Sequence, residues 1–71
     1  MHSEIELVNR KLEECFHRQR AYLANKPAGY LEDLKHECQA VATSSPSNLL
    51  RTAAVINQAA CEVILEEKAQ Q

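Results

Sequence analysis

Two short stretches hold the side chains of this chain that are best able to do chemistry. Cys15 is followed two residues later by His17, and His36 stands two residues before Cys38. Two thiols and two imidazoles match the ligand count of a structural zinc site. Both stretches lie in helical patterns, however, and residues two apart on a helix point about 200° away from each other. We therefore expect core cysteines and solvated histidines, and no metal site.

A catalytic cysteine would also need a histidine close in space, a pair of oxyanion donors and a pocket. The chain has one glycine, Gly29, so it contains no glycine-rich phosphate-binding loop, and it has no His-Glu-x-x-His motif. Aromatic residues make up only 4% of the chain, which leaves few large side chains to shape a pocket. We expect neither enzymatic activity nor a cofactor.

Charge and hydropathy favour a soluble, cytoplasmic protein. Eight Lys and Arg against ten Asp and Glu give a net charge of −2, without the basic excess that nucleic-acid binders use against phosphates. No apolar run reaches the roughly 18 residues of a membrane span, and no basic segment followed by an apolar one opens the chain. Three cysteines inside helical patterns fit a reducing compartment better than a disulfide framework.

Amphipathic segments separated by breaks predict an all-α protein with a single domain over residues 1–71. Ser3-Glu4-Ile5-Glu6 has the form of a capping box, after which apolar residues recur at spacings of three and four. The Pro27 and Gly29 region interrupts this pattern, and a serine followed by Pro46 predicts the cap and first residue of another helix. Short connections favour an antiparallel helical hairpin or a three-helix bundle. The expected helices cover residues of about 4–24, 30–42 and 46–68.

The third predicted helix is apolar over about twice the arc that a surface helix needs. Its expected inner face comprises Leu49, Ala53, Ile56, Ala60 and Val63. The other two helices offer only one good apolar stripe and one short stripe, too little to cover a second face. We therefore expect that second face to be exposed in the lone protomer and to bind a partner. It comprises Leu50, Ala54, Cys61 and Leu65.

Asn57 lies inside the apolar arc of the same helix and is included among the partner-binding candidates. It would either sit at the edge of the core, hydrogen-bonded to a neighbour, or act as a buried polar residue that fixes the register of a helix partner.

The segment from Pro46 through Leu49 and Ile56 to Ile64 resembles the C-terminal helix of the small YscE-like co-chaperones of type III secretion systems. Those proteins are short helical hairpins. The resemblance implies a cytosolic bacterial protein that pairs with a larger helical-repeat co-chaperone, the two together holding the needle subunit unpolymerised before export. The separate middle segment, from Tyr30 to Val41, departs from a plain two-helix hairpin.

The residues themselves favour a small helical co-chaperone or adaptor whose apolar surface is completed by another chain. Two alternatives remain open. One is a small DNA-associated regulator that uses the basic residues of the first helix, for which salt-dependent binding to duplex DNA would be required. The other is a self-assembling helical dimer that needs no separate partner.

Overall fold

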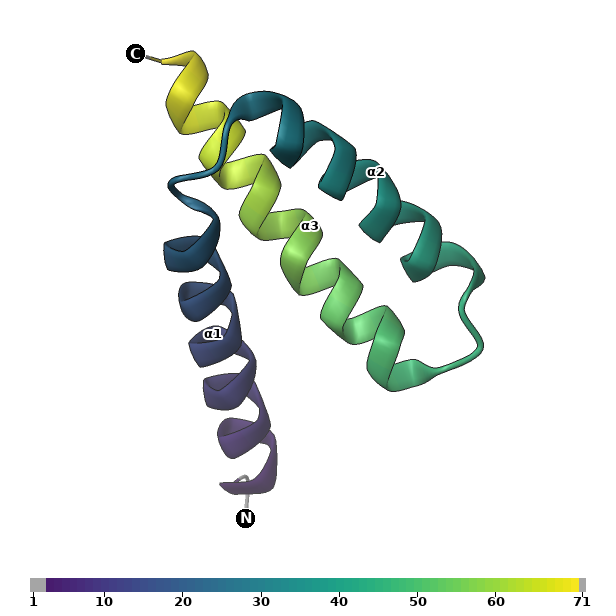
Figure 1. Ribbon diagram of the computed structural model, residues 1–71. Coiled ribbons are helices and arrows are strands. Elements are labelled where there is room, and N and C mark those ends of the chain that lie inside the picture. The colour runs from purple at the N-terminus through teal and green to yellow at the C-terminus, as the bar shows by residue number, and fades with distance from the viewer. Residues whose placement is uncertain (1–2, 71) are drawn as a thin grey trace.

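The computed structural model describes residues 3–70, which form three helices and no strand. These are α1 (Ser3–Leu23), α2 (Ala28–Ser44) and α3 (Asn48–Ala69). α2 and α3 form an antiparallel pair, and α1 packs against α3 from another side (Figure 1). The prediction of a small all-α bundle is therefore confirmed, and the three-helix form is the one that the chain adopts. α3 is the central helix because it packs against both of the others.

Two helix starts differ from the predicted ones. α2 begins at Ala28 rather than residue 30, with Pro27 in extended geometry as its N-cap, so Gly29 lies in the first helical turn instead of a loop. α3 begins at Asn48 rather than Pro46, because Ser47 is the N-cap and its hydroxyl accepts a hydrogen bond from the Leu50 backbone N–H at 3.2 Å. The Ser45 hydroxyl accepts from the Ser47 N–H at 3.2 Å, which orders the loop before the helix instead of capping it.

The buried core lies at one end of the bundle, where the C-terminal parts of α1 and α3 meet the start of α2. Leu31, Ala60 and Cys61 are fully buried there, and the half-buried Phe16 packs against them. The cluster of buried residues consists of Leu23, Leu31, Ala60, Cys61 and Ile64. These residues come from all three helices, so this end holds the fold together.

The turn between α1 and α2 is reinforced by aromatic side chains at the same end. The Lys26 ammonium lies 5.0 Å from the centroid of the Tyr22 ring and 5.4 Å from that of Tyr30. A cation within about 6 Å of a ring is attracted by the negative charge on the ring face. The Lys26 backbone N–H also donates to the Leu23 carbonyl at 3.0 Å. The turn therefore fixes how α1 leaves the core.

The opposite end of the molecule is open. α1 and α3 lie close together near the α1–α2 loop and diverge toward the N-terminus of α1 (Figure 1). The radius of gyration is 13.3 Å, whereas a compact domain of this length is expected to have about 11 Å. The smallest dimension of the molecule is only 16 Å. The chain thus forms an extended, flat bundle that closes at one end only.

No helix within residues 3–70 combines the length and the apolar character that crossing a membrane would require.

Candidate functional site

The open end exposes an apolar stripe on the N-terminal half of α1. Ile5, Val8 and Leu12, which we call the α1 stripe, are 69%, 56% and 37% exposed. Their spacing of three and four residues places them on one side of the helix. Farther along α1, Phe16 is half-buried against the core and Leu23 is 1% exposed. The apolar pattern of α1 is therefore continuous, but only its C-terminal half is covered.

The α1 stripe continues into a shallow hollow of about 400 Å³ between the three helices. Leu12 contributes from α1 and Ala42 from α2, while Val55 and the half-buried Ile56 contribute from α3. We call the α1 stripe together with Val55 and Ile56 the open face. Val55 is 54% exposed although it lies between the two neighbouring helices. The open face therefore contains residues of both α1 and α3, and a helix lying between these two helices would contact residues of both.

The one charged residue that lines this hollow is engaged by the loop before α3. The Arg51 guanidinium donates hydrogen bonds to the Ser45 carbonyl oxygen and to the Asn48 side-chain oxygen. Arg51 is itself half-buried. Because these two hydrogen bonds hold Arg51 within the chain and most of the other lining residues are apolar, the hollow offers mainly apolar contacts to an incoming group.

The predicted partner-binding residues of α3 do not form one exposed surface. The expectation that they would be exposed in the lone protomer is wrong for Ala54 and Cys61, which are 6% and 0% exposed. Leu65 is half-buried and packs against the core, so only Leu50, at 56%, is largely exposed. Asn57 is half-buried, and its side-chain amide donates to the Ala53 carbonyl at 2.9 Å.

The reason lies in the placement of α2. α2 runs antiparallel along α3 with Cys38 near Cys61, and Ala54, two turns before Cys61, is buried on the same side of α3. The expected inner face is buried at one end and exposed at the other, since Ala60 is fully buried whereas Leu49 is 79% exposed. α1 covers that face only near the core and then diverges. Whether an apolar residue of α3 is covered therefore depends on its position along the bundle, and not on the face of α3 to which it belongs.

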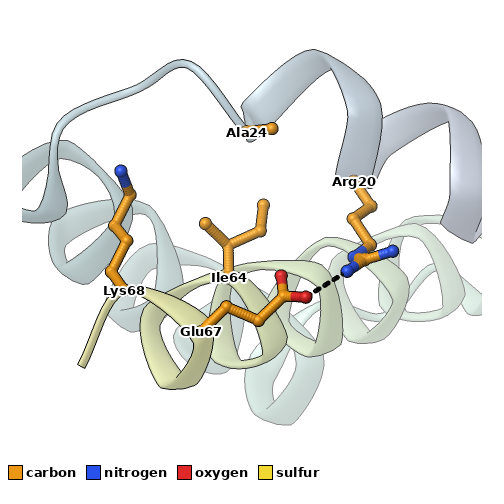
Figure 2. A pocket seen from close by; sticks show the side chains of 5 residues that line it. All are labelled: Arg20, Ala24, Ile64, Glu67 and Lys68. Atoms are coloured by element: carbon orange, nitrogen blue, oxygen red, sulfur yellow. Dashed lines mark hydrogen bonds and ion pairs between the residues drawn. The ribbon is translucent and has the colours of Figure 1, made fainter. Parts of the chain in front are cut away.

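A second hollow lies at the closed end, and an ion pair joins two of the residues that line it (Figure 2). The Arg20 guanidinium of α1 donates to the Glu67 carboxylate of α3 beside Ile64. Both charged side chains are about half exposed, at 39% and 52%. An exposed pair of this kind contributes little to stability, so the packing of Leu23 and Ile64 in the core determines how α1 approaches α3 at this end.

The arrangement of the three cysteines does not suggest a catalytic or metal-binding role. Burial raises the pKa of the Cys38 thiol, and the neighbouring Glu37 carboxylate adds to this. Burial likewise raises the pKa of the Cys61 thiol, with a further contribution from Cys38. A raised pKa keeps both thiols protonated at neutral pH and therefore poorly nucleophilic. Within residues 3–70 no group of three His, Cys, Asp or Glu side chains is placed to hold a metal ion.

Comparison with protein-family models, curated proteins and solved structures found no match to this chain. The resemblance of residues 46–64 to the YscE-like co-chaperones therefore stays a prediction.

Proposed function

We propose that this protein is a small helical protein-interaction module whose open face binds an amphipathic helix from another polypeptide. The observation that carries the proposal is the exposure of Ile5, Val8 and Leu12 beside the hollow that contains Val55. An amphipathic helix that lays its apolar side into an apolar groove is a common mode of recognition between proteins. Each square ångström of apolar surface removed from water stabilises such a complex by about 25 cal/mol.

The size of the core supports this role. The core has few large side chains: the largest that are fully buried are those of Leu23, Leu31 and Cys61, and no aromatic side chain is among them. A chain of 71 residues buries only about 60% of the surface that it exposes when unfolded. A partner that binds only the folded state would stabilise that state by mass action. A helix bound at the open face would thus cover the exposed apolar residues and, at the same time, stabilise the folded chain.

A co-chaperone or adaptor acting in the cytoplasm is the role that we assign to this module. In the specific form suggested by the resemblance of residues 46–64, the partner is a larger helical-repeat co-chaperone and the cargo is a type III secretion needle subunit. Genes for such proteins beside the gene for this chain would support that form. Their absence there, together with failure of the purified proteins to associate, would remove it and leave the general role standing.

The general role is tested by co-purification from the native cell, followed by identification of the bound chains by mass spectrometry. Val8→Glu places a charge on the open face, whereas Leu7→Glu places one on another side of the same helix, where Leu7 is 46% exposed. We expect a stoichiometric companion chain, or a second copy of the protein, with the wild type and with Leu7→Glu, and its loss with Val8→Glu. Retention of the same companions by Val8→Glu would contradict the proposal.

A further inference from the structure

We propose that the helix bound at the open face is α1 of a second copy of this chain, so that two α1 helices pair in antiparallel orientation about a two-fold axis. This inference rests on the proposed function and identifies its partner helix. Each copy would then cover the α1 stripe of the other with its own Ile5, Val8 and Leu12, all of which are exposed in the single chain.

The exposed area of the chain matches what such a dimer needs. The chain exposes 5314 Å², whereas a compact monomer of 8.0 kDa is expected to expose about 4,450 Å². The excess is therefore about 850 Å². Each partner in a protein–protein interface of standard size contributes about 800 Å². Pairing through the open end would therefore reduce the exposed area of each copy to about that of a compact monomer of the same mass.

The spacing of apolar residues along α1 is complementary to itself. Ile5, Val8, Leu12 and Cys15 follow one another at intervals of three, four and three residues, which is the seam pattern of paired helices. In an antiparallel pair centred near Arg10, Val8 faces Leu12 of the second copy and Ile5 faces Cys15 of the second copy. A two-fold axis produces each of these contacts twice. Cys15 is half-buried in the single chain, so part of its surface remains for this contact.

The charges beside the seam favour the antiparallel orientation. Glu4, Lys11 and Arg18 follow one another at seven-residue spacing along one edge of the stripe. In the register given above, Glu4 lies nearest to Arg18 of the second copy, and the two-fold axis produces this pair of opposite charges twice, while Lys11 lies nearest to Lys11 of the second copy. In a parallel pair the same edge meets Asn9, Phe16 and Leu23 of the second copy, and no opposite charges meet.

Lys11 has an acidic partner in its own helix, which offsets the like charge of Lys11 of the second copy. It forms an ion pair with Glu14 at 3.5 Å within its own helix, and the two side chains are 67% and 47% exposed. Exposed pairs one turn apart stabilise a helix only weakly. Repulsion between the two exposed Lys11 side chains is weak for the same reason, so the two Glu4–Arg18 pairs decide the orientation.

Sedimentation equilibrium of the full chain over a range of concentrations tests the pairing. We expect the wild type to form dimers, Leu7→Glu to dimerise as the wild type does, and Val8→Glu to raise the dimer Kd by at least about a hundredfold, since two valines are replaced by two buried carboxylates. Circular dichroism should show unchanged helix content in both variants, because both side chains are largely exposed. Alkylation of Cys15 should slow as the wild type dimerises.

Charge reversal tests the orientation. Glu4→Lys and Arg18→Glu should each weaken the dimer, and the chain that carries both changes should dimerise about three- to tenfold more tightly than the two separate effects predict. A dimer that is lost with Val8→Glu but shows no coupling between Glu4 and Arg18 would overturn the antiparallel register.

A wild type that stays monomeric at every concentration, or a Val8→Glu dimer as tight as that of the wild type, would overturn the inference. The two proposals can be separated. If the wild type is monomeric and a different companion chain is still lost with Val8→Glu in the native cell, the second copy is excluded and the interaction module stands. If Val8→Glu changes neither assay, both proposals fail.

Discussion

Replacing Leu31 by alanine should show that the stability of this protein is concentrated at the closed end. Leu31 is 0% exposed and lies in the cluster that joins the three helices. Truncating a buried leucine to alanine costs about 2–5 kcal/mol, through lost burial and through the cavity that remains. A chain of 71 residues is expected to have a free energy of unfolding of about 4–10 kcal/mol. We expect Leu31→Ala to remove about 3 kcal/mol, a large part of the total.

Urea unfolding followed by far-ultraviolet circular dichroism gives this free energy. With a denaturant slope of about 1 kcal/mol per M, a loss of about 3 kcal/mol lowers the unfolding midpoint by about 3 M. Leu50→Ala is the matched control, because it makes the same chemical change at a side chain that is 56% exposed. The control should change the free energy by no more than about 0.5 kcal/mol. Equal effects of the two substitutions would refute the placement of the core.

Three further outcomes follow from the local structure. Ser47→Ala removes the hydroxyl that caps α3 and should cost about 1 kcal/mol in urea unfolding, whereas Ser44→Ala should cost much less. Gly29→Ala should raise the thermal midpoint by the equivalent of about 0.5 kcal/mol, because Gly29 is helical and an added Cβ meets no atom within 4 Å; a lower midpoint would contradict this. The pKa values of Cys38 and Cys61 are raised above the ordinary 9.0, so the folded state holds these protons longer than the unfolded state, and stability should fall as the pH rises past about 9. Cys38→Ala should make that fall in midpoint between pH 8 and pH 10 smaller, and an equally steep fall would contradict the assignment.

The helices of this protein could be predicted from the sequence because their signals are local. Spacings of three and four residues determine each helical segment, and the region around Pro27 and the region around Pro46 separate them. The starts of α2 and α3 were each misplaced by two residues. Ser45 and Ser47 flank the same proline, and the sequence does not indicate which hydroxyl reaches the unpaired backbone N–H groups.

The arrangement of the apolar surface could not be predicted, because it depends on how whole helices are oriented. The sequence shows that α3 is apolar over a wide arc, but not that Ala54 and Cys61 would be buried on the side along which α2 runs. Nor does it show that α1 would contact α3 through Phe16 and Leu23 and then diverge, leaving Val8 exposed. The search for a partner surface on α3 therefore found Leu50 and missed the α1 stripe, although the apolar spacing of α1 was visible. Comparing each stripe with the area available to cover it could have identified α1.

Amide hydrogen exchange over a range of protein concentrations tests most directly the claim that one end of this bundle is left open for a helix from another chain. At the lowest concentration, the amides around Val8 should exchange rapidly while those around Ala60 and Cys61, within the core, are protected. As the concentration rises and α1 pairs with a second copy, protection around Val8 should increase and protection in the core should change far less. Core-like protection around Val8 at the lowest concentration would mean that α1 closes the bundle by itself, and would contradict the account.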